Sequence, residues 1–143
     1  MSFVVKGLDS VMEGFAHAAV LPDAVYDKML FSAADVMVKE VASSANAHLQ
    51  GPYTTGDLVE NIKHGKIRKS SKGSRFTDVI FAGRVVDKHH PKGERRAKIA
   101  FINEYGKHGQ PARPFIRLAI ESGTVKALNA AADIYYEEIN DYL

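Results

Sequence analysis

The chain contains no cysteine and no tryptophan among its 143 residues. Without cysteine it can form no disulfide, no thiolate nucleophile and no Cys-ligated zinc site. No apolar run approaches the roughly 18 residues that a transmembrane helix needs, and the first residues lack the pattern of a secretory signal peptide. These absences predict a protein that is made and assembled in the cytoplasm and does no cysteine chemistry.

Sequence motifs of catalysis are also missing. The six histidines show no metal-binding spacing, and there is no nucleophile elbow, phosphate-binding loop or dinucleotide fingerprint. The adjacent carboxylates Glu137 and Glu138 would point about 100° apart on a helix, which favours a solvated face over an acid/base pair. The sequence therefore predicts a protein that is not an enzyme and uses no cofactor or metal.

Helical periodicity is the strongest pattern that is present. From residue 23 to about residue 49, apolar side chains recur every three or four positions, and Gly51 and Pro52 end the pattern. A shorter helix over residues 8–19 follows a brief strand at residues 4–7. Near the C-terminus, one helical segment runs to about Ile120 and a last amphipathic helix covers residues 124–143.

The middle of the chain has the composition of strands. Residues 61–69, 77–86 and 96–104 are separated by short polar stretches, which favours antiparallel pairing. In the third segment Ala97, Ile99 and Phe101 would lie on one face of a strand, and Lys98 and Glu104 on the other. The predicted fold is one α+β domain over residues 1–143, with a long N-terminal helix and a C-terminal helix packed on an antiparallel β-meander of three to four strands.

Charge is distributed unevenly along the chain. Residues 63–98 hold 12 Lys and Arg against three Asp and Glu, a net charge of +9, whereas the rest holds seven against 14, a net charge of −7. Two predicted hairpins carry most of these cations: Lys66, Arg68, Lys69, Lys72 and Arg75 on the first, and Lys88, Lys92, Arg95 and Arg96 on the second.

Three interpretations of the basic hairpins remain open. They could contact DNA phosphates, or they could be solvated loops whose lysines discourage edge-to-edge strand pairing. Alternatively, they could meet the acidic last helix of a neighbouring copy, and that helix carries Asp133, Glu137, Glu138 and Asp141.

Two local motifs stand out. The first is Thr55-Gly56-Asp57-Leu58-Val59-Glu60-Asn61-Ile62. In it Thr55 or Thr54 can cap a helical turn, and Gly56 permits a tight entry. Leu58 and Ile62 can pin the turn to the core.

The second motif lies about forty residues later. It consists of Glu104-Tyr105-Gly106 followed by Pro111-Ala112-Arg113-Pro114-Phe115. Gly106 can close the third strand with a positive φ, the two prolines stiffen the loop, and Phe115 offers an apolar anchor. A cation is unfavourable where a helix begins, so we expect Arg113 to be held by a carboxylate, for which Glu104 is the nearest candidate.

Together and in this order, the two motifs resemble those of the bacteriophage tail-component family, whose members complete the tail or join it to the head at the neck. Asn61 replaces the serine usual in that family. The resemblance implies a virion structural protein of siphophage-like phages and prophages, assembled in the host cytoplasm, with no catalytic residue. It also implies a ring, a hexamer, that binds neighbouring neck and tail proteins.

Two other functions stay open at this stage. A small DNA-binding accessory protein would use the basic hairpins without sequence specificity and would lose DNA affinity steeply with salt. An enzyme with a concealed site is the third possibility. The sequence does not separate tail-terminator, head-closure and tail-completion roles.

Overall fold

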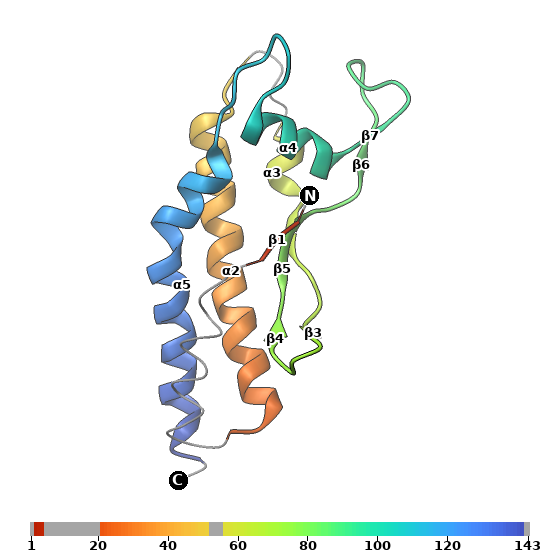
Figure 1. Ribbon diagram of the computed structural model, residues 1–143. Helices are drawn as coiled ribbons and strands as arrows, with labels where there is room; N and C mark the ends of the chain where they lie inside the picture. The colour runs from red at the N-terminus through yellow and green to blue at the C-terminus, as the bar shows by residue number, and fades with distance from the viewer. Residues whose placement is uncertain (1, 5–20, 52–55, 142–143) are drawn as a thin grey trace.

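The computed structural model describes residues 2–4, 21–51 and 56–141 (Figure 1). Its helices are α2 (Asp23–His48), α3 (Asp57–Glu60), α4 (Arg96–Tyr105) and α5 (Phe115–Ile139). Its strands are β1 (Ser2–Val4), β2 (Ile62–His64), β3 (Arg68–Lys69), β4 (Arg75–Phe76), β5 (Asp78–Phe81), β6 (Arg84–Val85) and β7 (Glu94–Arg95). The predicted α+β class, with long N-terminal and C-terminal helices, is confirmed. None of the helices in the described ranges is long and apolar enough to cross a membrane.

Helix α2 is the central element of the fold. Figure 1 shows it between α5 on one side and the small sheet on the other. The predicted apolar stripe forms its buried face, where Met29, Met37 and Val41 are at most 1% exposed. The helix ends at Leu49, whose backbone N–H donates to the Ala45 carbonyl at 2.8 Å. The sequence therefore predicted this helix and both of its ends.

Helix α5 runs antiparallel to α2 without a break (Figure 1). The predicted interruption between residues 120 and 124 is wrong, because Gly123 lies inside the helix and is buried against α2. A Cβ atom at Gly123 would lie 2.8 Å from Cγ of Glu40 and 3.0 Å from Sδ of Met37. Tight packing between the two helices, and not a turn, explains this glycine.

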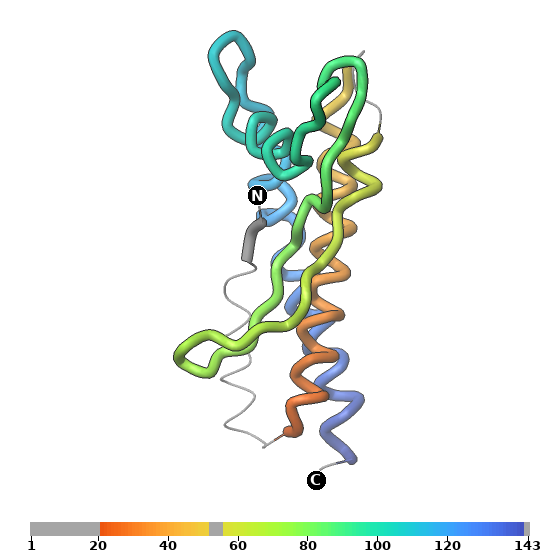
Figure 2. The backbone as a smooth tube through the Cα atoms, turned by 90° about the vertical axis from the view of Figure 1, so that its right-hand side faces the viewer, coloured from red at the N-terminus to blue at the C-terminus, as the bar shows by residue number. Residues whose placement is uncertain are grey.

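The sheet is small and antiparallel, in the order β1-β5-β2. In the central strand β5, Val79 and Phe81 are buried, and Phe81 pairs in register with Ile62 of β2. Two separate ribbons, β3-β4 and β6-β7, lead to the hairpins that project from the body (Figures 1 and 2). The two predicted strands 61–69 and 77–86 are thus each split between the sheet and a ribbon.

The predicted third strand over residues 96–104 is wrong, because this segment forms helix α4. Ala100 and Glu104, four residues apart, are its buried positions, whereas Phe101 is half exposed. Four of its first five residues, Arg96, Ala97, Lys98 and Ala100, are good helix formers, and their preference prevails over a short alternation of apolar residues. The third strand of the sheet is instead β1, which begins two residues before the expected strand at residues 4–7. The expected helix over residues 8–19 lies outside the described residues.

Candidate functional site

A pocket of about 430 Å³ lies at the end of the molecule where α2 ends and α5 begins. Its apolar lining comes from three helices and one strand: Ala45 and Leu49 from α2 or its end, Leu58 and Val59 from α3, Ile102 from α4, and Val85 from β6. Four separate stretches of the chain therefore meet here: residues 45–49, 56–59, 85–90 and 99–113.

The pocket is also lined by polar side chains, among them two cations and two histidines. His89 and His90 belong to the loop of the β6-β7 hairpin, while Lys107 and Arg113 belong to the loop before α5. Lys107 and Gln110 exchange two backbone hydrogen bonds of 2.9 Å, which hold the Lys107 backbone in a tight turn. The sequence analysis had not singled out Lys107 or the two histidines as site residues.

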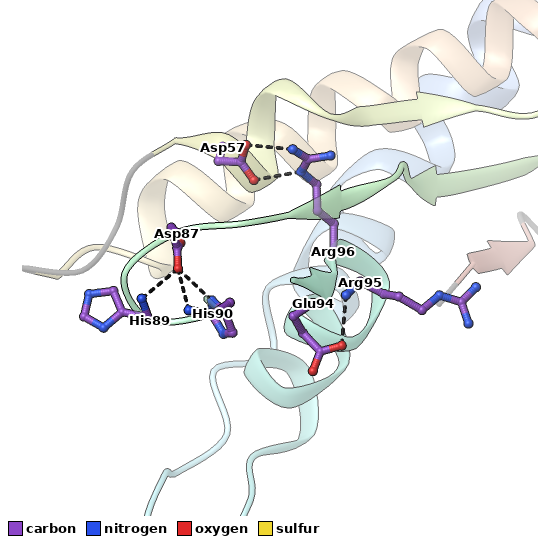
Figure 3. A network of polar contacts seen from close by, with 7 residues as sticks. All are labelled: Asp57, Asp87, His89, His90, Glu94, Arg95 and Arg96. Carbon is purple, nitrogen blue, oxygen red and sulfur yellow. Dashed lines mark hydrogen bonds and ion pairs between the residues drawn. The ribbon is translucent and has the colours of Figure 1, made fainter. Parts of the chain in front are cut away.

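Asp87 organises the histidine loop (Figure 3). Its Oδ1 accepts hydrogen bonds from the backbone N–H groups of His89 and His90, at 2.9 and 2.7 Å, and lies 3.1 Å from Nδ1 of His90. Burial acts to raise the pKa of Asp87, but the hydrogen bonds from His90 and His89 outweigh it, so this pKa lies below its ordinary value. The loop therefore keeps an ionised carboxylate beside two imidazoles.

Asp57, which lines the pocket, forms a bidentate ion pair with Arg96 (Figure 3). Nε of Arg96 lies 2.7 Å from Oδ2 of Asp57, and Nη2 lies 2.9 Å from Oδ1. Nη1 donates to the Ala82 carbonyl at 2.9 Å. The hydrogen bonds to Asp57 raise the pKa of Arg96. This pair joins the first turn of α4 to α3. Arg96, which was predicted to be a surface cation for an external partner, is therefore engaged within the protein.

The predicted ion pair between Arg113 and Glu104 is wrong. Nη2 of Arg113 donates to Oδ1 of Asn103 at 2.9 Å, and its backbone N–H donates to the Asn103 carbonyl at 2.6 Å. Glu104 instead accepts two backbone N–H groups from the first turn of α5, where unpaired N–H groups and the helix dipole favour a carboxylate. Arg113 has no carboxylate partner in the described part of the chain.

The two sequence motifs lie together in space. Gly56 and Leu58 of the first motif and Arg113 of the second line the same pocket. Ile62 pairs with Phe81, and the ring of Phe81 packs edge-on against Phe115 with centroids 6.0 Å apart. Thr55 lies outside the described residues, so the cap predicted for it is not described.

The loop of the second motif has the geometry that its glycine predicts. Gly106 has φ +77°, and a Cβ atom there would lie 2.8 Å from the Gln110 carbonyl oxygen and from the Ala112 nitrogen. It ends helix α4, however, and not a strand. Pro114 precedes the first residue of α5, whereas Pro111 is exposed. Tyr105 is exposed as well, and its ring lies 4.8 Å from that of Phe101.

Most of the cations of the first basic hairpin form ion pairs within the protein. Arg68 binds Asp78 and lies over the ring of Phe76, Lys69 lies 3.7 Å from Asp23, and Nε of Arg75 donates to Asp27 at 2.7 Å. Lys66 and Lys72 are exposed and form no ion pair with the residues that the structure describes. Only these two cations of the hairpin are left for an external partner.

The second hairpin keeps more of its charge free. Lys88, Lys92 and Arg95 are exposed and form no ion pair within the described ranges. Glu94 accepts a hydrogen bond from Lys98 at 2.7 Å and one from the Arg95 backbone N–H (Figure 3), and these bonds lower the pKa of Glu94. In this hairpin the ion pair between Glu94 and Lys98 is internal, whereas Lys88, Lys92 and Arg95 are left for an external partner.

The acidic residues near the end of α5 lie at the opposite end of the molecule from the pocket (Figure 1). Oε1 of Glu138 lies 2.7 Å from Nζ of Lys28 in α2. Asp133, Glu137 and Asp141 are exposed and form no ion pair with other described residues. The neighbouring Tyr136 is 64% exposed.

Within the described residues, no group of three or more His, Asp or Glu side chains is placed to hold a metal ion. A scan of the chain against models of protein families found no match, and searches of curated proteins and of solved structures found none either.

Proposed function

We propose that the protein is a structural component of a tailed bacteriophage or prophage. It completes the tail or joins it to the head by associating into a ring, a hexamer by the family resemblance, and by binding neighbouring neck and tail proteins. It does so through shape and charge complementarity, without bond chemistry. Its place is the virion, after assembly in the cytoplasm of the bacterial host.

The observation that carries this proposal is that residues of both motifs line one pocket and are linked through one contact in the core. Residues about fifty positions apart, Leu58 and Arg113, line the same cavity, and Ile62 reaches Phe115 through Phe81. If the motifs resembled those of the tail-component family by chance, nothing would require them to pack together. The projecting hairpins add arms with free cations, as an assembly surface requires.

Deletion of the gene from an inducible prophage tests the proposal. Without the protein we expect electron micrographs of separate full heads and unfinished tails, and a plasmid copy should restore joined, infectious particles. The wild-type protein should also be present in purified virions by mass spectrometry. Normal infectious particles from the deletion strain would reject the structural role.

A second function is supported by the free hairpin cations. Lys66, Lys72, Lys88, Lys92 and Arg95 could grip DNA phosphates, since none of them is engaged by a carboxylate in the described part of the chain. In fluorescence anisotropy with a labelled random duplex at about 50 mM salt, replacing Lys72 and Lys92 by Gln should then reduce the salt slope of log K by about 2.

A matched control replaces Lys39 and Arg117, which are exposed cations outside the hairpins. Equal losses in the two double variants would show only non-specific attraction to the net charge. No binding by the wild-type protein at that salt concentration would dismiss the DNA-binding function.

A further inference from the structure

Helix α5 carries charges of the unfavourable sign at both ends. Arg113 directly precedes the N-cap residue Pro114, where the helix dipole favours anions, and no acidic residue belongs to the first turn. Lys107 lines the same pocket as Arg113, from the loop before the helix. Glu137 and Glu138 lie in its last turn, where the dipole favours cations, and no basic residue accompanies them there. Glu104 and Lys28 each relieve part of this conflict from another helix.

The charges that remain uncompensated are complementary to each other. At one end, Lys107 and Arg113 have no carboxylate partner in the described part of the chain. At the other end, Asp133, Glu137 and Asp141 have no cation within the same ranges. Local conflicts of this kind tend to occur at functional sites, where a partner resolves them.

The shapes of the two ends also correspond. The cationic end has an apolar pocket of about 430 Å³, which falls in the range of cavities that accept an organic ligand or a large side chain. The acidic end presents Tyr136, 64% exposed, between Asp133 and Glu137. An aromatic side chain in a pocket, surrounded by charged pairs, is the usual centre of a protein interface.

The two surfaces cannot meet within one chain. Helix α5 has 25 residues and so spans about 37 Å, and Figure 1 shows its beginning beside α4 and its end at the far tip of the molecule. Contact between them therefore requires a second copy of the chain, in a head-to-tail arrangement that generates a ring where its rotation closes.

We infer that the pocket formed by α2, α3, α4 and the loop before α5 receives Tyr136 from the end of α5 of a second copy. Lys107 and Arg113 then face the carboxylates of Asp133, Glu137 and Asp141 of that copy. This inference rests on the proposed function, because it names the contact through which the proposed ring associates.

A charge swap tests the contact. Lys107→Glu and Glu137→Lys are both changes of exposed residues without an ion pair in the described part of the chain, so each variant should fold, as circular dichroism will verify. In analytical ultracentrifugation each variant alone should associate at least about tenfold more weakly than the wild-type protein. An equimolar mixture should regain wild-type association, because each unlike pair of chains then has opposite charges at both contacts.

Tyr136→Ala tests the aromatic anchor, with Val125→Ala as its control. Val125 is 66% exposed on the same helix, so both variants remove a similarly exposed apolar side chain. We expect the first to weaken association about tenfold or more and the second to leave it unchanged. Equal effects, or a mixture of charge variants that does not recover, would overturn the inference.

The other occupants of the pocket give different results. If Lys107→Glu blocks binding of a neighbouring tail protein while self-association is unchanged, the pocket holds a foreign segment and the inference is wrong. A strictly monomeric wild-type protein at about 100 µM also overturns it. If rings form and Tyr136→Ala does not weaken them, the proposed contact is wrong and the proposed function is unaffected. If association depends on Tyr136 but virions form without the protein, only the phage role is wrong.

Discussion

Oε2 of Glu104 accepts the backbone N–H of Ile116 at 2.7 Å, and its Oε1 accepts that of Arg117 at 3.0 Å. A side chain of α4 thus caps the start of α5, which has no capping side chain of its own. Because Glu104 is only 6% exposed, both hydrogen bonds are shielded from water. This contact ties α4, which lines the pocket, to the first turn of α5.

Replacement of Glu104 by Gln should lower the free energy of unfolding by about 2 kcal/mol, the scale of losing a charged acceptor at a buried helix end. Urea denaturation followed by circular dichroism measures this loss. Glu121→Gln, an exposed change in α5, is the control and should stay within about 0.5 kcal/mol of the wild-type value. Similar values for the two variants would contradict the capping role.

Glu40 should make stability depend on pH. Its carboxylate lies 2.7 Å from Nζ of Lys126 and accepts a hydrogen bond from Ser122, and these contacts lower the pKa of Glu40 below 4.5. A lowered folded-state pKa contributes stability above the unfolded-state value, and this contribution is lost as pH falls through the folded-state pKa. We therefore expect Glu40→Gln to cost about 1 kcal/mol at pH 7 and progressively less as pH falls below 4.5, as measured by urea denaturation at pH 7 and at successively lower pH. A difference that persists at the lower pH would be contrary to this assignment.

Gly123→Ala should destabilise the protein by about 1 kcal/mol, although alanine is the better helix former by a similar amount. The added methyl group would lie too close to Glu40, whose side chain is held by Lys126 and Ser122. In a Glu40→Ala background the same change should cost less, because the Cγ contact at 2.8 Å is gone while those with Sδ of Met37 and Cβ of residue 40, at 3.0 and 3.1 Å, remain. Thermal unfolding of the wild-type protein, the two single variants and the double variant measures this coupling, and additive effects would exclude it.

Arg96→Lys should not preserve the link between α3 and α4. Lysine cannot form two parallel hydrogen bonds to Asp57 and also donate to the Ala82 carbonyl in the same geometry. We expect a loss of about 1–2 kcal/mol and faster amide hydrogen exchange in α4. The neighbouring Arg95→Lys, at an exposed position, should change neither quantity, and equal protection in both variants would refute the anchoring role.

Long periodic helices could be predicted from the sequence, whereas short elements could not. Helix α2 repeats its apolar positions over 26 residues, which leaves no other interpretation. Helix α4 has only ten residues, and the alternation of Ala97, Ile99 and Phe101 imitates a strand over that length. The buried pair Ala100 and Glu104 becomes visible only once α5 supplies the N–H groups that Glu104 accepts.

The motif residues were found from sequence, but their contacts were not. Arg113 and Glu104 were expected to pair because a charge needs an opposite charge, yet backbone N–H groups satisfy Glu104 and an amide satisfies Arg113. The pocket has no local signal at all, since its lining comes from four separate stretches. Lys107 could have been singled out only by knowing that the loop before α5 folds back over α3.

The pairing of α2 with α5 has a consequence for biosynthesis. Helix α2 leaves the ribosome well before α5 has been translated, and its apolar face has little to cover it except the small sheet until then. Contacts between segments so far apart in the chain slow folding and leave nascent apolar surface exposed. We therefore expect the newly made chain to depend on chaperones until its last helix emerges.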